Sequence, residues 1–137
     1  TGRFKQFRSG LAQLDEEGVV QVLRDPDTGD MAPTLAAVGQ LQFEVVLHRL
    51  KGEYGVAARL EPCRFSVARW ITSDNKAALE KFIASEPLRI AYDVVGAPAF
   101  LVQYGSDLRV AEQRSPDIQF HAMREHSGRV FGAAPSL

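Results

Sequence analysis

The chain has 137 residues, of which 45% are hydrophobic and 24% charged, a composition that excludes disordered, collagen-like and coiled-coil proteins. Its 16 Lys and Arg against 17 Asp and Glu give a formal charge of -1, so no overall positive field predicts nucleic-acid or membrane binding. The single cysteine, Cys63, excludes an internal disulfide, and no apolar run reaches the roughly 18 residues of a membrane helix. We therefore expect a cytoplasmic α/β domain of ordinary size.

The first 62 residues predict the order helix, strand, strand, helix, strand. Apolar side chains recur every three or four residues in two stretches, the pattern of amphipathic helices. Short β-branched runs lie beside them, separated by turn residues at 25–29. The expected elements are a helix from about 4 to Gly18, strands 19–23 and 35–38 paired as a hairpin, a helix 40–54 capped by Gly55, and a strand 56–60. This order is that of a split βαβ unit whose first strand would lie before Thr1, as in a cut fragment.

The second half predicts the same kinds of elements, with a different amino-acid sequence. The expected elements are a strand 65–71, a helix capped by Asp74 that ends at Pro87, strands 88–94 and 100–104, a helix 106–114 and a strand 118–122. From residue 127 onward Gly, Ala and Pro predominate, so 127–137 is expected to be a disordered tail. The sub-halves, about 1–62 and 63–126, form either two units or one sheet, and the brief break at Pro62 favours one compact domain over 1–126.

Nucleotide-binding loops are absent from the sequence. It contains neither G-x-x-x-x-G-K-[ST] nor G-x-G-x-x-G, the glycine-rich loops that hold phosphates. Cys63 would need a basic partner to act as a nucleophile, and no pattern supplies one, which favours a buried structural cysteine.

Two groups of side chains have metal-ligand chemistry. Glu44 and His48 lie one helical turn apart, but Lys51 nearby would repel a cation, so a solvated polar face is the favoured interpretation. His121, Glu125 and His126 form the second group, at the end of the last expected strand. Neither group has the full ligand set of a structural metal site, and we predict no metal.

Basic side chains are concentrated in the last third of the chain. They are Arg109, Arg114, Arg124 and Arg129, with His121 and His126 interleaved. Such a cluster can contact RNA phosphates whatever the net charge, and the alternative is a set of scattered surface arginines. Aromatic residues on the expected strands, such as Trp70 and Phe100, are expected in the core rather than on a base-stacking surface.

Three stretches carry a more specific pattern. They are Gly10–Val22 (GLAQLDEEGVVQV), Val38–Val46 (VGQLQFEVV) and Ser115–His126 (SPDIQFHAMREH). Together they resemble the C-terminal domain of bacterial peptide chain release factor 3, a family of translational GTPases, over nearly the whole chain from Gly10 to His126. The segment Gly39–Glu44 is also similar, more loosely, to the third domain of elongation factor G.

This resemblance implies a ferredoxin-like α+β fold that lacks its first strand and is extended by a second small α/β half. It implies a parent protein with a GTP-binding domain and a β-barrel, which drives class I release factors off the ribosome in translation termination. GTP and magnesium would belong to the absent G domain, so this fragment would hold no cofactor and would be non-catalytic. Its partners would be rRNA, small-subunit ribosomal proteins and the other two domains. The contact residues would be Arg114, His121, Arg124 and His126.

Two alternatives stay open at this stage. One is a free-standing small enzyme that uses Cys63 or the group His121, Glu125 and His126. The other is a regulatory module that binds a small ligand between the two halves.

Overall fold

The computed structural model of the chain describes residues 2–25, 29–37, 39–122 and 129–135. In chain order its elements are α1 (Gly2–Glu16), β1 (Gln21–Asp25), β2 (Gly29–Ala37), α2 (Gln40–Tyr54), β3 (Ala58–Glu61), β4 (Val67–Thr72), α3 (Lys76–Ser85), β5 (Ile90–Tyr92), β6 (Pro98–Val102), α4 (Gly105–Arg114), β7 (Gln119–Ala122) and β8 (Arg129–Pro135). The strands form one antiparallel sheet in the order β3-β8-β2-β1-β5-β6-β4-β7. The predicted α+β class is confirmed.

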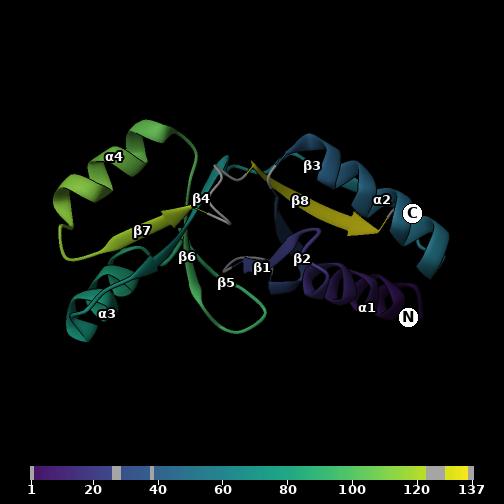
Figure 1. Cartoon of the computed structure of the whole chain (residues 1–137), viewed down its shortest axis with the longest axis horizontal. Coiled ribbons are helices and arrows are strands. Elements are labelled where there is room, and N and C mark those ends of the chain that lie inside the picture. Colours follow the sequence, from purple (N-terminus) through teal and green to yellow (C-terminus); the bar gives the residue numbers. More distant parts are fainter. Residues whose placement is uncertain (1, 26–28, 38, 123–128, 136–137) are drawn as a thin grey trace.

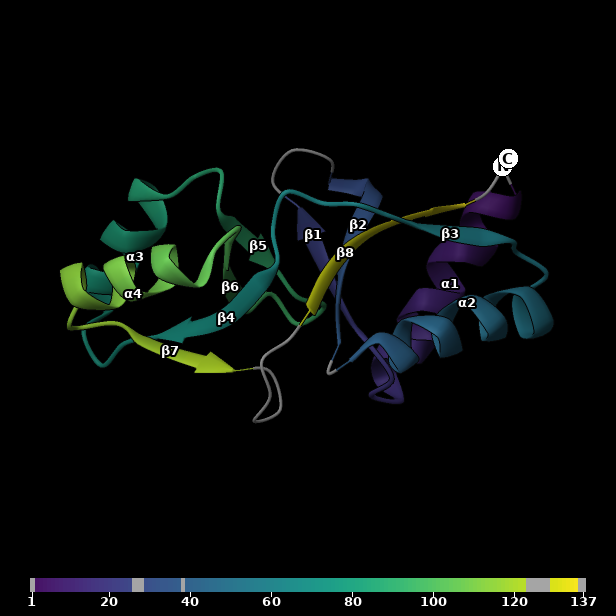
Figure 2. The same ribbon diagram turned by 90° about the horizontal axis from the view of Figure 1, so that it is seen from above.

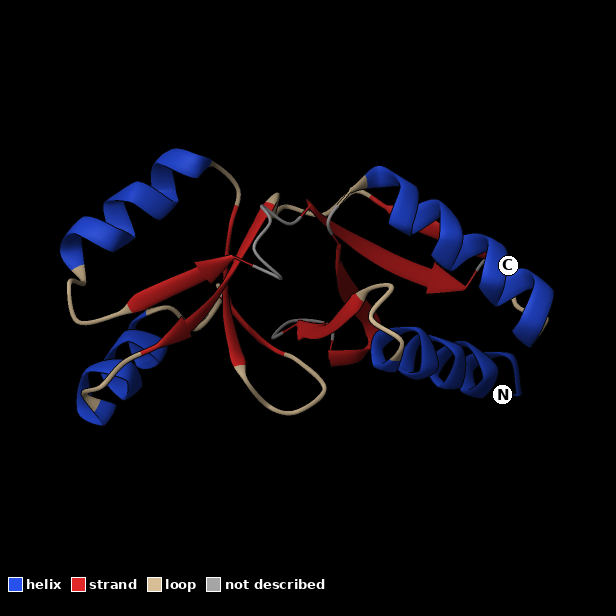
Figure 3. Ribbon diagram, in the orientation of Figure 1, coloured by secondary structure: helices blue, strands red, loops and turns tan. Residues whose placement is uncertain are grey.

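The two helix pairs lie at opposite ends of the molecule with the sheet between them (Figures 1 and 2). Figure 3 shows the strands in the middle, with α1 and α2 at one end and α3 and α4 at the other. The sheet curls strongly enough to bring β8 close to β4, although four strands lie between them in the strand order. Both predicted halves therefore contribute to one continuous sheet.

Each helix pair covers a core of its own. At one end Phe7 of α1 and Phe43 of α2, both fully buried, pack with Leu35 of β2. At the other end Phe100 of β6 packs edge-to-face with Phe82 of α3, at 5.1 Å between ring centroids. Because side chains alternate along each strand, these residues occupy only one face of the sheet in each half.

A third core lies between the two halves, on the opposite face of the curled sheet. Leu23 of β1 and Ala36 of β2 pack there with Leu101 of β6, and all three are fully buried. Trp70 of β4 packs against the same cluster. The halves are therefore joined by a shared apolar core as well as by backbone pairing, which for β1 and β5 is the single pair Arg24–Tyr92.

Strand β8 corrects two expectations from the sequence. Residues 129–135 form a strand instead of belonging to a disordered tail, and they pair with both β2 and β3. In a ferredoxin-like fold the first strand lies between the strands that precede and follow the second helix, antiparallel to both. Here those strands are β2 and β3, so β8 fills the place predicted for a strand before Thr1. The first half is thus a circularly permuted ferredoxin-like unit closed by the far end of the chain.

The predicted helix ends are mostly confirmed. Gly18 (φ 83°) and Gly55 (φ 68°) take the left-handed conformation after α1 and α2, and Val56 N–H donates to Leu50 O at 3.0 Å. The start of α3 differs by one residue: Asn75, not Asp74, accepts the N–H of Ala78.

The hairpin of β1 and β2 is confirmed, with β2 starting earlier than expected, at Gly29. The strand expected over 100–104 ends at Val102, because Tyr104 is the N-cap of α4. Among the described residues, no helix has the length and apolar character needed to cross a membrane.

Candidate functional site

Arg114 lies at the C-terminal end of α4, on the helical side of the sheet. Its side chain is exposed and stands between two adjoining hollows in the groove that separates α3 from α4. These hollows measure about 400 and 230 Å³. A basic residue in the last turn of a helix also interacts favourably with the helix dipole. The position therefore leaves the guanidinium available to a ligand or partner that approaches the groove.

Two further cations share this groove with Arg114. Arg89, after α3, lines the larger hollow, and Lys81 of α3 lines the smaller one. Carboxylates are interspersed among them, and Arg89 Nε lies 3.9 Å from Glu86 Oε2. Lys81 and Arg89 could not be predicted from the sequence, because only the docking of α3 beside α4 brings them near Arg114. The α3–α4 groove, defined by Lys81, Arg89 and Arg114, is the candidate contact site on this side of the sheet.

His121 lies on the other side of the sheet. Its neighbour Phe120 packs edge-to-face on Phe82 in the helix-covered core, at 5.7 Å between ring centroids. Because alternate residues of a strand face opposite sides, His121 points away from α3 and α4. Its Nε2 lies 2.7 Å from Thr72 Oγ1 of the adjacent strand. The structure therefore does not bring His121 together with Arg114, and the predicted contact patch is split between two faces.

The other two predicted contact residues, Arg124 and His126, lie outside the described residues, as does Glu125 of the candidate metal group. In the described ranges, no group of three or more His, Cys, Asp and Glu side chains is placed to hold a metal ion. Glu44 and His48 are exposed on α2.

Cys63 is half-buried beside the core shared by the two halves. Its sulfur accepts the N–H of Phe65 at 3.3 Å and lies 3.5 Å from the carbonyl oxygen of the same residue. These local contacts and the packing of Cys63 indicate a structural role in the loop between β3 and β4.

An ion network joins the two helices of the first half. Arg49 of α2 donates to Glu17 Oε1 at 2.5 Å and to Glu53 Oε2 at 2.6 Å. Hydrogen bonding from Arg49 lowers the pKa of both carboxyls below their usual value of 4.5. In turn, Glu53 and Glu17 raise the pKa of Arg49. The network lies at the opposite end of the molecule from the α3–α4 groove and serves to hold α2 against the end of α1.

The fold is that of a ferredoxin-like α+β domain. The sequence profile described as class II release factor RF3, C-terminal domain, matches residues 1–112, and the chain belongs to this family.

Curated relatives named peptide chain release factor 3 match almost all of the chain. The protein of Bordetella petrii is 59% identical over 131 residues, which are 96% of this chain and 24% of the relative. That of Bordetella avium is 58% identical over 130 residues, 95% of this chain and 24% of the relative. That of Nitrosomonas europaea is 52% identical over 132 residues, with 96% and 24% covered. The chain thus spans about a quarter of the length of these relatives.

Proposed function

We propose that this chain is the ribosome-facing domain of a GTP-dependent peptide chain release factor, which promotes dissociation of class I release factors from the ribosome in translation termination. The observation that carries the proposal is family membership, together with 52–59% identity to release factor 3 proteins over nearly the whole chain. Translation places such a factor in the cytoplasm. The domain would act as one unit with the G domain and β-barrel of the same protein.

The architecture suits a mechanical role. Three apolar cores share one sheet, so in this proposal a contact at one helix pair would be transmitted through packed side chains to the other. The two helix-covered ends are far enough apart to touch different partners (Figure 1). A body of this kind can dock on another domain at one end and on rRNA or a small-subunit protein at the other.

GTP binding and hydrolysis would belong to the G domain of the same protein, which would hold GTP and magnesium. The fragment would therefore neither bind nor hydrolyse GTP. A titration of the 137-residue chain with a fluorescent GTP analogue checks this directly. Saturable binding at micromolar nucleotide would contradict the proposal that the fragment does not bind GTP. It would favour the alternative of a free-standing enzyme.

The α3–α4 groove is the proposed ribosomal contact. Lys81, Arg89 and Arg114 offer the side chains that dominate contacts to RNA phosphates. His121 lies on the opposite face of the sheet, so it, Arg124 and His126 are proposed as a separate contact and are tested separately from the groove.

The experiment compares Lys81→Glu/Arg114→Glu with a control, Lys51→Glu, in the full-length factor. Lys51 is exposed on α2 at the other end of the molecule. We expect the double variant to weaken ribosome binding by about tenfold or more at low salt, because two attractive charges become repulsive, and the control to leave it unchanged. Equal affinity in all three proteins would remove the groove from the contact surface; Arg124→Glu tests the neighbouring segment in the same assay.

A further inference from the structure

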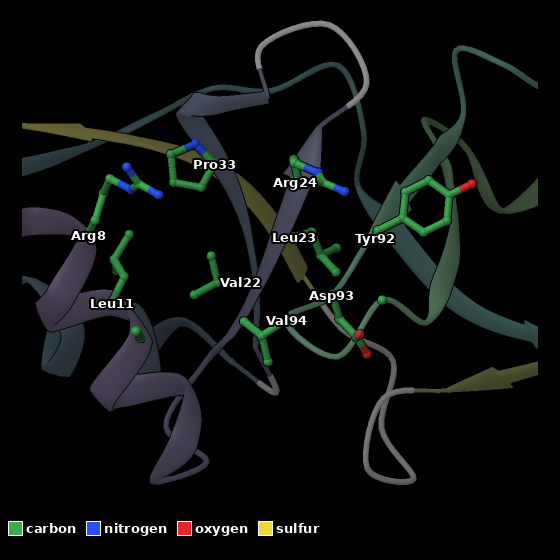
Figure 4. Close-up of a pocket in the computed structure, with 11 residues that line it drawn as sticks. Arg8, Leu11, Val22, Leu23, Arg24, Pro33, Tyr92, Asp93 and Val94 are labelled. Carbon is green, nitrogen blue, oxygen red and sulfur yellow. The ribbon is translucent and has the colours of Figure 1, made fainter.

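A second cavity lies at the junction of the two halves, away from the α3–α4 groove. It measures about 370 Å³ and is bounded by α1, by β1 and by the loop that joins β5 to β6 (Figure 4). The single backbone pair between β1 and β5, Arg24 with Tyr92, contributes both of its residues to the lining. A volume of this size is within the range of pockets that bind small molecules or side chains.

The floor of this cavity is aliphatic. Leu11 of α1 and Leu23 of β1 are buried beneath it, and Val22 is half-buried. On its outer side Val94 is 60% exposed, and the next residue, Val95, is 84% exposed. Two adjacent valines on a loop tip are apolar surface that a partner can cover.

The valines are held in place by a fixed turn. Asp93 Oδ1 accepts the N–H groups of Val95 and Ala97 at 3.0 and 2.8 Å, and Asp93 Oδ2 accepts Trp70 Nε1–H at 3.0 Å. Gly96 permits the turn because its φ is 85°. The Asp93 carboxylate is thus occupied by hydrogen bonds that fix the loop. The two valines at its tip are therefore preorganised, which lowers the entropic cost of binding.

The rim of the cavity is cationic. Arg8 of α1 and Arg24 of β1 lie on either side of it (Figure 4). A shallower hollow continues from it along α1, shares Arg8, and adds Lys5 and Phe4. The sequence from Gly2 to Leu14 holds three basic residues and no acidic one. A ligand along this path therefore meets aliphatic surface below and positive charge at the edges.

We propose that this groove binds an acidic peptide segment that carries an aliphatic anchor side chain. The anchor would occupy the floor over Leu11 and Leu23 and cover Val94, and flanking carboxylates would face Arg8 and Arg24, since guanidinium groups pair well with carboxylates. RNA fits this lining less well: single-stranded bases bind by stacking on aromatic rings, and although Phe4 and Tyr92 lie along the groove, its floor is aliphatic. The proposal is independent of the ribosomal role of the α3–α4 groove.

The test is fluorescence anisotropy with the 137-residue chain and a labelled synthetic peptide in which Glu and Asp alternate with Leu. Three comparison probes separate the contributions: the same peptide with Lys for the acidic residues, the acidic peptide with Ala for Leu, and oligouridine RNA. We expect saturable binding of the acidic leucine peptide that weakens with salt, and at least about tenfold weaker binding of the other probes.

Variants on two different elements locate the site. We expect Arg24→Glu and Arg8→Glu each to weaken binding of the acidic leucine peptide several-fold, and Arg109→Glu, on α4, to leave it unchanged. Val94→Asp should abolish binding, while Leu41→Asp, at a 69% exposed position on α2, should not. Thermal melts and Trp70 fluorescence verify that each variant is folded.

Three outcomes would overturn the proposal. They are failure of the acidic leucine peptide to saturate, equal binding of the Lys or Ala peptide, and tighter binding of oligouridine that is lost in Arg24→Glu. Peptide binding that survives Arg8→Glu, Arg24→Glu and Val94→Asp in folded proteins would equally exclude this groove.

Discussion

Two glycines in the paired helices of the first half offer a matched test of close packing. A Cβ added at Gly10 of α1 would lie 2.6 Å from Leu50 Cδ2 and 3.1 Å from the ring of Tyr54, both on α2. A Cβ added at Gly52 of α2 would meet nothing within 4 Å. Both replacements by Ala improve helix propensity, by about 1 kcal/mol. Only the first forces a buried neighbour to move.

The balance between overpacking cost and gain in helix propensity decides whether each variant is more or less stable. Leu50 is 1% exposed, so its side chain has no open space to rotate into, and overpacking of this kind costs about 1–3 kcal/mol. For Gly10→Ala this cost matches or exceeds the propensity gain, giving a net loss of about 0–2 kcal/mol. For Gly52→Ala no overpacking cost opposes the gain in helix propensity, so the free energy of unfolding should rise by about 0.5–1 kcal/mol. The two variants should therefore differ by about 1–3 kcal/mol, with Gly52→Ala the more stable.

Urea unfolding measures this difference. The single tryptophan, Trp70, reports the core between the halves, and far-UV circular dichroism reports the helices, so coincident transitions would validate a two-state analysis. If Gly10→Ala proves as stabilising as Gly52→Ala, then α1 and α2 are not in the close contact described, and the reasoning from the Gly10 position fails.

Two further predictions concern the junction and the ion network. Asp93→Ala removes the acceptors that fix the β5–β6 loop, so we expect a loss of about 1–3 kcal/mol in unfolding free energy and a shifted Trp70 emission maximum; unchanged emission and stability would contradict the described turn. Because the folded-state pKa values of Glu17 and Glu53 are lowered by Arg49, the stabilisation is present above the usual value of 4.5 and is lost as pH falls through the lowered values. The difference in urea midpoint between wild type and Arg49→Met should therefore be clear at neutral pH, shrink in acid and decrease in concentrated salt, and a difference that grows on acidification would refute the network.

Local features of the fold could be predicted from the sequence because they depend on a few neighbouring residues. The apolar face of α2 and its glycine cap at Gly55 require only the helical period and a left-handed residue. At α3 the same logic was wrong by one residue, since Asp74 and Asn75 are adjacent and both can cap a helix. The alternation that places Phe120 and His121 on opposite faces was also readable in the sequence.

Long-range features could not be predicted in this way. Residues 129–135 are rich in Gly and Ala, and their strand state depends on β2 and β3, which lie about 70 or more residues away in sequence and provide the backbone partners. The grouping of Lys81, Arg89 and Arg114 depends on how α3 docks beside α4. The cavity at the junction likewise exists only because the sheet continues from β1 to β5.

We propose above all that this domain acts mechanically in recycling class I release factors. Its most direct test measures how fast a labelled class I factor leaves termination ribosomes, with the full-length protein and with a version that lacks this domain, while GTP binding is followed in parallel. We predict that the shortened protein still binds GTP but no longer accelerates departure of the class I factor. Departure at the full-length rate without this domain would contradict the account.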